Sequence, residues 1–336
     1  MEKKREKSIL GIGNALTDIL VILQDEGLLE KFHLPKGSMQ HVDEQTGVKI
    51  WQAIKGLDAQ YVPGGSAANT ITGCAIFGMP SGFIGKVGDD ELGSLFKSGQ
   101  ENIGICSTLL RGNKPTGRAM VFITAPGSER TFATYLGSAL EMTAADLRPE
   151  FFSGYDYFYI EGYLVQNQAL LRRAVELARE AGSIIALDMA SYNIVESNDA
   201  FLYDIIEKYV DIVFANEAEA RVFAKKEPRE ALDEIAGLCD IAVVKLGPEG
   251  SMIKSGRQYC KIEAWPAATI DATGAGDLYA AGFLYAHAHG MPIRICGEVG
   301  SAISAKVVEV IGPKVDIPRW KSAKQAIRRL MGENAE

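Results

Sequence analysis

Short apolar segments alternate with longer amphipathic ones between residues 157 and 254, and this alternation strongly limits how the chain can fold. Strands separated by helices of about ten residues favour a parallel sheet with helices packed on both faces. The chain is therefore predicted to be an α/β protein with a doubly wound, mostly parallel sheet. The expected strands are residues 157–160, 184–187, 212–215, 241–245 and 251–254, and the expected helices are 168–181, 201–209, 217–224, 278–289 and 299–308.

The first half of the chain has a less regular pattern. Residues 118–124 and 130–135 flank Ala125-Pro126-Gly127-Ser128, which is typical of a β-hairpin. Segments 16–43 and 113–136 are expected to form a small accessory sheet within one domain spanning residues 1–336, and the polar residues 24–43 are not expected in a core. Further strands are expected at 9–12, 19–23 and 82–87, and helices at 66–77, with Ser66 as N-cap, and at 92–102.

The net charge of −8 and the sequence pI of about 5.3 restrict the partners of the chain. An acidic protein repels nucleic acids and anionic membranes, so neither is an expected partner. The negative charge of the protein also repels a nucleoside triphosphate at long range. Any phosphate site must therefore be built locally, from backbone N–H groups, a metal ion and a few basic side chains.

The five cysteines are odd in number, widely scattered and without a C-x-x-C pair. This pattern indicates reduced thiols rather than a disulfide framework or a structural zinc site, and the expected location is the cytoplasm. The N-terminal segment has no clean apolar run of the kind found in a secretory signal, and no stretch approaches the length of a membrane span.

A glycine-rich turn leads directly into the helix predicted after residue 277. Gly274, Ala275 and Gly276 let a ligand approach the backbone closely, and the first N–H groups of a helix lack intrahelical partners. Together with the helix dipole they form an anion site. Asp277 at this position is suited to accept a proton from a hydroxyl that attacks phosphorus. The alternative is a plain glycine turn with an acidic residue in the first helical turn.

Two other glycine turns carry polar residues. Gly64 and Gly65 open a predicted helix in which Asn69 follows about one turn later, although, taken alone, this pattern is better explained by a plain turn. Asn14 and Asp18 follow the first strand, and a carboxylate there can accept hydrogen bonds from two neighbouring hydroxyls. The dinucleotide fingerprint G-x-G-x-x-G is excluded, because Leu16 stands where its last glycine is needed.

Asn216 and Glu219 stand at a strand end with the spacing of a capping box, which is as good an explanation as a role beside magnesium-bound water. Arg130 on the hairpin is either a surface charge or a side chain that folds over the site and neutralises a transferring phosphoryl group. Neither a Walker A sequence nor the H-R-D loop of protein kinases is present.

Taken in order, these motifs resemble those of the ribokinase-like (PfkB) family of carbohydrate and nucleoside kinases over essentially the whole chain. The one departure is Ala272, where the family usually has Thr or a similar small residue. The matching segments are Gly13-Asn14 with Asp18, Gly64-Gly65 with Asn69, residues 84–90 with Gly93, Asn216 with Glu219, Leu246-Gly247 with Gly250, and residues 271–277.

The resemblance implies an ATP-dependent phosphotransferase with a Rossmann-like core and a small β-sheet lid, which is often a dimer contact. The resemblance also implies that the reaction needs Mg²⁺ and ATP, and that K⁺ binds the loop before the helix predicted after residue 277. The resemblance implies that Asp277 is the base, that Gly274 and the amides of Ala275, Gly276 and Asp277 form the anion hole, and that Arg130 stabilises charge. The residues that it implies for binding the acceptor are Asn14, Asp18, Gly64, Gly65 and Asn69, and those for binding ATP are Asn216, Glu219, Lys245, Gly247, Gly250 and residues 301–312. It further implies that Glu219 contacts Mg²⁺ through water and that Asp271 and Thr273 bind K⁺.

Within the family, residues 11–19, 28–32 and 35–39 are most similar to those of bacterial adenosine kinase-like members. The resemblance thus favours adenosine as acceptor, with ribose, fructose or a related sugar as the alternative. A catalytically silent nucleotide- or sugar-binding protein is a third reading, which the carboxylate at position 277 disfavours. A nucleoside needs an apolar slot for its base, and the expected lining is Leu16, Met39, Phe122, Phe132 and Tyr135.

Overall fold

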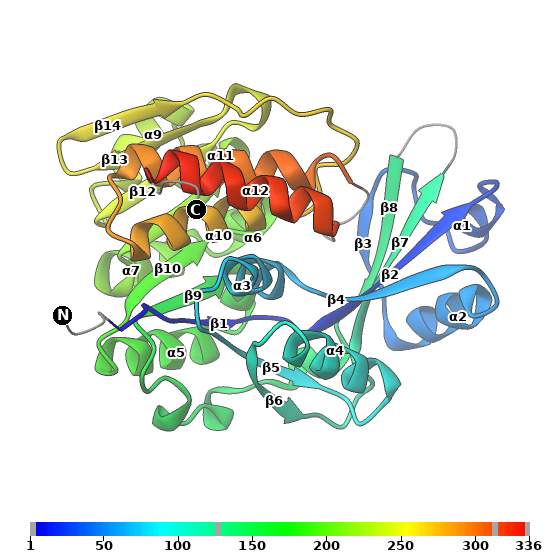
Figure 1. Ribbon diagram of the computed structural model, residues 1–336. Coiled ribbons are helices and arrows are strands. Elements are labelled where there is room, and N and C mark those ends of the chain that lie inside the picture. The colour runs from blue at the N-terminus through cyan, green and yellow to red at the C-terminus, as the bar shows by residue number, and fades with distance from the viewer. Residues whose placement is uncertain (1–4, 125–128, 311–314, 333–336) are drawn as a thin grey trace.

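The computed structural model describes residues 5–124, 129–310 and 315–332. Its centre is a nine-stranded sheet with the order β14-β13-β12-β11-β10-β9-β1-β5-β6 (Figure 1). The pairs from β6 to β12 are parallel, and β13 and β14 are antiparallel. The strands are β1 (Ile9–Ile12), β5 (Ser81–Val87), β6 (Cys106–Arg111), β9 (Tyr157–Glu161), β10 (Ile184–Asp188), β11 (Ile212–Asn216), β12 (Ile241–Lys245), β13 (Ser251–Ser255) and β14 (Gln258–Ile262).

Helices cover both faces of this sheet because side chains alternate along each buried strand. Tyr157 and Tyr159 face one core, and Phe158 and Ile160 face the other. The first core contains buried residues of α3 (Ser66–Ile76), α4 (Glu91–Glu101), α10 (Ala275–Ala288), α11 (Ile293–Val307) and α12 (Ile317–Leu330). The second contains those of α5 (Gln168–Glu180), α6 (Tyr192–Ser197), α7 (Asp199–Tyr209), α8 (Glu217–Ala224) and α9 (Pro228–Ile235).

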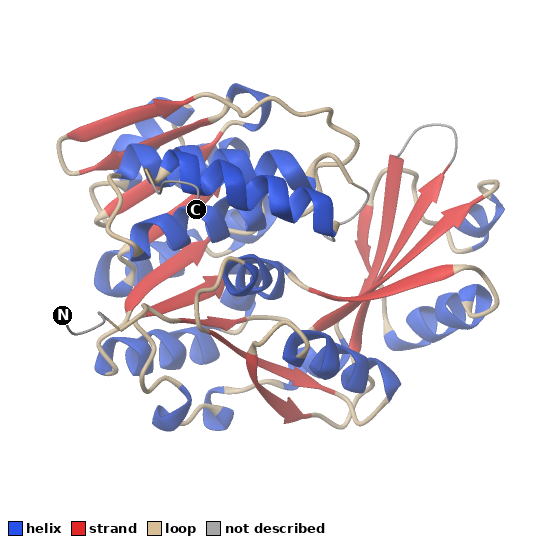
Figure 2. Ribbon diagram, in the orientation of Figure 1, coloured by secondary structure: helices blue, strands red, loops and turns tan. Residues whose placement is uncertain are grey.

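A second, five-stranded sheet with the order β3-β8-β7-β2-β4 stands beside the carboxyl ends of the parallel strands (Figure 2). One of its faces packs against α1 (Gly27–Lys31) and α2 (Glu44–Ile54) around a core of its own. Its other face is turned toward the large sheet. The strands are β2 (Leu16–Leu23), β3 (Met39–His41), β4 (Ala59–Gly64), β7 (Gly117–Thr124) and β8 (Glu129–Tyr135).

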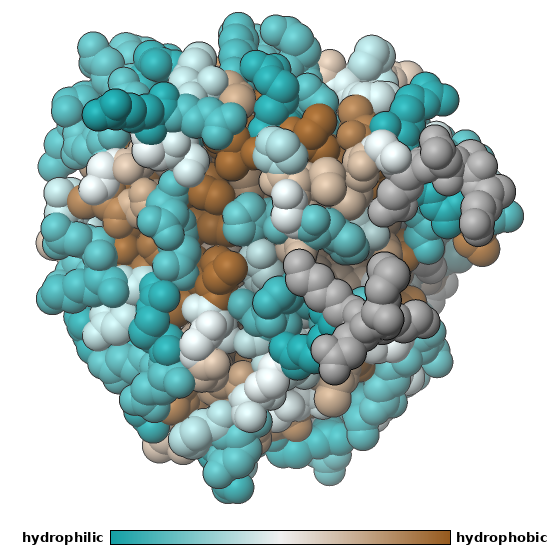
Figure 3. All heavy atoms as spheres, turned by 60° about the vertical axis from the view of Figure 1, so that its left-hand side comes forward, coloured by the Kyte–Doolittle hydropathy of each residue, from teal (hydrophilic) through white to brown (hydrophobic). Residues whose placement is uncertain are grey.

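Short 3₁₀ helices complete the connections, at Gly137–Glu141, Ala144–Asp146, Pro149–Phe151, Gly162–Gln166 and Gly247–Glu249. On the face seen in Figure 3, hydrophilic residues surround a strip of apolar ones. Among the helices that the structure describes, none combines the length and apolar character needed to cross a membrane.

The predicted α/β fold with a mostly parallel sheet and a smaller second sheet is confirmed. The small sheet contains β2 and β3 from the predicted segment 16–43 and β7 and β8 from the predicted segment 113–136, and it also contains β4, which the sequence did not predict. Residues 24–43 also contribute to a core, since Leu29 and Leu34 are buried there. The turn predicted at residues 125–128 lies outside the described residues.

Ser66 is not the N-cap of α3, contrary to the prediction. Gly65 occupies that position with φ of 100°, a left-handed region that favours glycine, and Ser66 is the first helical residue. A side chain on Gly65 would also lie 2.3 Å from the carbonyl oxygen of Asn14. The glycine therefore lets the start of α3 press against the segment that follows β1.

Candidate active site

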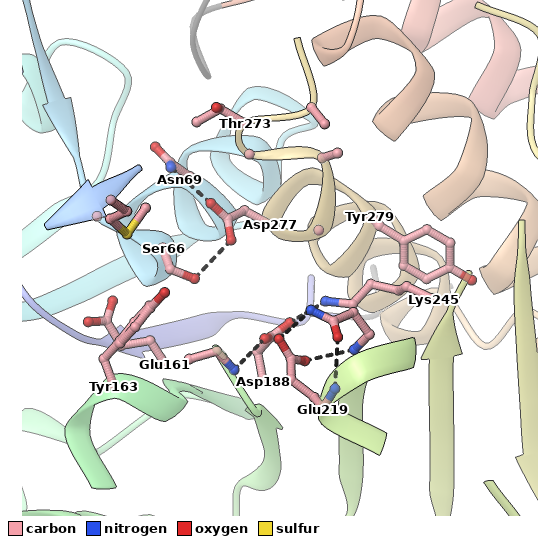
Figure 4. A pocket seen from close by; sticks show the side chains of 18 of the residues that line it. Ser66, Asn69, Glu161, Tyr163, Asp188, Glu219, Lys245, Thr273, Asp277 and Tyr279 are labelled. Carbon is pink, nitrogen blue, oxygen red and sulfur yellow. Dashed lines mark hydrogen bonds and ion pairs between the residues drawn. The ribbon is translucent and has the colours of Figure 1, made fainter. Parts of the chain in front are cut away.

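A cavity of about 1590 Å³ opens between the small sheet and the carboxyl ends of the parallel strands. Its lining comes from most of the chain, with residues from the end of β1, the starts of α3 and α10, and the ends of β9 to β12 (Figure 4). Ligands of open α/β sheets bind at this edge. Most of the sequence-predicted site residues line it: Asn14, Asp18, Gly65, Asn69, Asn216, Glu219, Lys245, Gly247, Gly250, Thr273, Gly274, Ala275, Gly276 and Asp277.

Asp277 lies where the N-terminal ends of two helices meet. Its Oδ1 accepts a hydrogen bond from Ser66 Oγ at 2.8 Å, and its Oδ2 accepts one from Asn69 Nδ2 at 2.9 Å (Figure 4). Burial raises the pKa of Asp277 to about 6, against the opposing effect of the hydrogen bond from Asn69. The carboxylate is thus held in a defined orientation, and its pKa suits a general base near neutral pH.

Gly274 makes the entry into α10 possible. It is the N-cap residue with φ of 76°, and Ala275 N donates to Ala272 O at 3.1 Å to close the turn. The Ala275 N–H, predicted as part of the anion hole, is therefore already used. Within the described residues, the N–H groups of Gly276 and Asp277 have no protein acceptor, so these two remain available for an anion.

Lys245 adds a side-chain cation to this anion site. A Cβ atom on Gly276 would lie 3.0 Å from Lys245 Nζ, which places the ammonium beside the start of α10. Lys245 Nζ forms an ion pair with Asp188 Oδ2 at 2.6 Å, and both side chains are largely buried. Asp188 therefore fixes the direction in which Lys245 points.

Asn216 and Glu219 form the capping box of α8, which the sequence offered as one of two readings. Glu219 N donates to Asn216 Oδ1 at 2.9 Å, and Asn216 N donates to Glu219 Oε2 at 2.7 Å. Burial raises the pKa of Glu219 to about 7, and the nearby Asp188 adds to this effect. Both residues also line the cavity, so the capping geometry leaves them at its edge.

Asp18 faces the cavity from β2, across from the turn at Gly64. A Cβ atom on Gly64 would lie 2.2 Å from the Asp18 carboxyl group, so glycine is required there to leave the carboxylate in place. Burial raises the pKa of Asp18 to about 7; the charge of Asp277 raises it further and that of Arg130 opposes the shift. Asp18 and Asp277 are thus close enough to influence each other.

Glu161, at the end of β9, was missed by the sequence reasoning. Its Oε1 accepts a hydrogen bond from Asn14 N at 2.9 Å, and its Oε2 accepts one from Ala67 N at 3.0 Å. Burial raises the pKa of Glu161 to about 7. It joins the segment after β1 to the start of α3. Its position as the last residue of an apolar strand, like that of Asp188 in β10, is the sequence pattern that could have indicated this edge.

Arg130 reaches from β8 to the loop before α10. Its Nη1 lies 2.8 Å from Asp271 Oδ2, and both side chains are buried. The other carboxylate oxygen of Asp271 accepts hydrogen bonds from Thr273 N at 3.1 Å and Thr273 Oγ1 at 2.9 Å. Neither Arg130 nor Asp271 lines the cavity, in contrast to Thr273.

The apolar part of the cavity lies under the small sheet. Leu16, Met39 and Phe132 line it as predicted, whereas Phe122 and Tyr135 do not. Phe122 packs in the core beneath α2, because alternate residues of a strand face opposite sides of the sheet. Additional apolar lining comes from residues that the sequence reasoning missed: Leu136, Ala139, Leu140, Met142, Tyr163 and Leu164.

The opposite part of the cavity is bordered by Gly247, Gly250 and the first half of the predicted segment 301–312. Ser301 and Ser304 line it, and Trp265 N donates to Ser301 Oγ at 2.8 Å. Residues 311 and 312 lie outside the described residues. The cavity therefore has two compartments, one beneath the small sheet and one beside α11, with Asp277 between them.

Comparison with known proteins identifies the family. The profile of the "pfkB family carbohydrate kinase" matches residues 45–320. The chain belongs to the pfkB family of carbohydrate kinases. It is therefore an ATP-dependent kinase, and kinases of this family use ATP with a divalent metal, generally Mg²⁺.

The proteins that this pfkB-family kinase resembles include adenosine kinases and sugar kinases. Among solved structures, the chain is similar to the adenosine kinase from Sinorhizobium meliloti, with a TM-score of 0.85 and 31% identity over 96% of this chain and 100% of that one. It is equally similar to a probable sugar kinase from Rhizobium etli, with a TM-score of 0.85 and 31% identity over 96% of this chain and 98% of that one. The adenosine kinase of Schizophyllum commune is 26% identical over 337 residues, which cover 92% of this chain and 96% of that protein.

We expect the kcat/KM of this pfkB-family kinase to fall as the pH drops below about 6 to 7. Burial raises the pKa of Asp277 to about 6, so this residue, which the sequence predicts to be the base, becomes protonated in this range rather than near pH 4. The raised pKa of Asp18, about 7, broadens the fall. This pH dependence is tested by measuring initial rates, and from them kcat/KM, across the pH range at saturating Mg²⁺ and ATP. A flat profile down to about pH 5 would exclude a base with a raised pKa.

Proposed function

We propose that this pfkB-family kinase transfers the γ-phosphoryl group of ATP to the 5′-hydroxyl of adenosine, giving AMP and ADP. The observation that carries the proposal is the apolar compartment beside Asp18. Leu16, Met39 and Phe132 offer apolar area for a flat base, and Asp18 with Asn14 offers polar groups for a ribose. A free sugar has no group that would use the apolar compartment.

In the proposed reaction, Asp277 orients the acceptor hydroxyl and takes its proton while the phosphoryl group is transferred. Ser66 and Asn69 hold the carboxylate in the required direction. The N–H groups of Gly276 and Asp277, with Lys245, stabilise negative charge on the phosphoryl oxygens. Most of the rate enhancement then comes from positioning and charge, because phosphoryl transfer has a loose transition state.

The carboxylates of Glu219 and Asp188 fit a role beside magnesium. Hard cations such as Mg²⁺ prefer carboxylate and water oxygens, and both groups lie at the cavity edge near Lys245. Glu219 is engaged with Asn216, so it would contact the ion through water. Bound with ATP, Mg²⁺ would neutralise phosphate charge. No group of three or more His, Cys, Asp or Glu side chains arranged for a metal ion occurs in the described part of the chain.

A sugar kinase is the second candidate. The polar groups of Asp18, Asn14 and Asn69 are also those that a pentose or hexose would need, and the similar structure from Rhizobium etli is named a probable sugar kinase. A silent binding protein is disfavoured by the oriented carboxylate of Asp277.

The single domain over residues 1–336 and the lid-mediated homodimer remain predictions. Because α1 and α2 cover one face of the small sheet and the cavity lies at the other, its edge strands β3 and β4 are the parts left for such a contact.

The acceptor is tested by coupled ADP release over adenosine, other nucleosides, ribose and fructose, together with calorimetric titration of each compound. We expect adenosine to bind in the micromolar range and to be turned over, and the rate to fall to background in EDTA. If adenosine binds no better than millimolar while a pentose or hexose binds in the micromolar range, the nucleoside proposal is wrong and the sugar kinase stands. Turnover that persists in EDTA would contradict the magnesium role.

A further inference from the structure

The loop that precedes α10 depends on the carboxylate of Asp271. Ile270 N and Asp271 N donate to Val308 O at 2.7 Å and 3.1 Å, which ties the loop to the end of α11. Asp271 Oδ1 then accepts both donors of Thr273. These bonds shape the turn that presents Gly276 and Asp277. The charge on Asp271 therefore needs a counter-charge, because a buried carboxylate without one is costly.

The resemblance to the family assigns that counter-charge to K⁺, but the donor set at Asp271 does not fit a bound cation. Arg130 Nη1 lies 2.8 Å from the second oxygen, Oδ2, and the side chains of both residues are only 6% exposed. A K⁺ ion at this carboxylate would lie against the buried guanidinium. Like charges repel strongly where water does not screen them. The sequence also departs from the family here, at Ala272.

We propose that the guanidinium of Arg130 is the resident counter-cation of Asp271, in place of a monovalent metal ion. The small sheet thereby supplies the charge that holds the phosphate-binding turn in shape. Arg130 acts through Asp271 and is a positioning residue in this role. The proposal rests on the phosphate site at Gly276 and Asp277 but not on the identity of the acceptor.

Two consequences distinguish this proposal from the K⁺ site that the resemblance implies. The rate of the wild-type kinase should be the same, within about twofold, in equal concentrations of K⁺ and tetramethylammonium. Its melting temperature should also be the same in the two salts, because a cation that binds only the folded state would raise it. Wild-type stimulation well beyond twofold, or a K⁺-dependent rise in melting temperature, would overturn the proposal.

The decisive variants are Arg130→Gln and Arg130→Lys, compared with Arg257→Gln at an exposed position on the turn between β13 and β14. Arg130→Gln removes the guanidinium charge beside Asp271 Oδ2, so we expect it to gain K⁺ sensitivity: a higher melting temperature in K⁺, and a thallous-ion signal in thallium NMR that K⁺ displaces. Arg130→Lys keeps the charge and should stay insensitive, as should Arg257→Gln.

Because the melting and NMR measurements need no acceptor, they remain informative if adenosine proves to be the wrong substrate. An Arg130→Gln protein that folds and shows no response to K⁺ or Tl⁺ would overturn the proposal, since the charge at Asp271 would then be balanced by another group. If Arg130→Gln folds only in the presence of K⁺, the proposal is supported. If it fails to fold in either salt, a K⁺-sensitive Arg130→Lys protein overturns the proposal and an insensitive one supports it.

Discussion

We expect Asp277→Asn to lower kcat by at least about two orders of magnitude, the loss typical of removing a positioned general base, while the affinity for ATP is retained. The amide has nearly the shape of the carboxylate, but it cannot take a proton from the acceptor hydroxyl. Only one of its two terminal atoms accepts hydrogen bonds, so it cannot accept from both Ser66 and Asn69 as the carboxylate does. Single-turnover rates and a fluorescent-nucleotide titration separate the two effects.

Ser66→Ala is the matched comparison, because it removes one of the two hydrogen bonds to Asp277 and leaves the carboxylate. We expect a much smaller loss of kcat for this variant, since Asn69 still orients the base. Near-normal turnover by Asp277→Asn would remove Asp277 from the mechanism. Equal losses in the two variants would mean that orientation, rather than proton acceptance, limits the rate.

We expect Asp18→Ala to raise the KM for the acceptor on the order of 100-fold and to leave the KM for ATP nearly unchanged. Hydrogen bonds to charged groups contribute about 1.5–3 kcal/mol each, and Asp18 is positioned to accept two from neighbouring hydroxyls. The variant should fold, because removing this carboxylate also removes a buried charge that Asp277 disfavours. Steady-state kinetics with each substrate varied in turn measures the split.

Asp58→Ala is the control for Asp18→Ala, because Asp58 is an exposed residue just before β4 of the same small sheet. It should leave both KM values unchanged. If Asp18→Ala changes the acceptor KM by less than about threefold, Asp18 does not bind hydroxyls of the acceptor. If it raises the KM for ATP by the same factor, the assignment of the two compartments to acceptor and nucleotide must be reversed.

The large sheet was predictable from the sequence because its strands are buried on both sides and its helices recur at regular spacing. Strands such as β11 and β12 are continuous apolar segments between clear helices, and their predicted and observed limits differ by at most one residue. The small sheet was less predictable. Its strand β4 contains Pro63 and polar residues, so only its pairing with β2 gives it a strand conformation.

The candidate site was predictable where glycine, small residues and one polar group follow each other in the chain. Gly274 and Asp277 are of this kind, and so are Gly65 and Asn69. Glu161 and Asp188 were missed because each is a single acidic residue at the end of a strand, and its partners come from elements that are distant in the sequence. The pairing of Arg130 with Asp271 was missed for the same reason.

The contact between Asp277 and α3 joins residues that lie 211 and 208 positions apart in the chain. The ribosome therefore synthesises Ser66 and Asn69 long before Asp277, the proposed base. During synthesis, the start of α3 therefore lacks its packing contact with α10 until α10 has been translated. Because Asp277 is the proposed base, we expect a nascent chain to gain kinase activity only after translation has passed the glycine turn at Gly274.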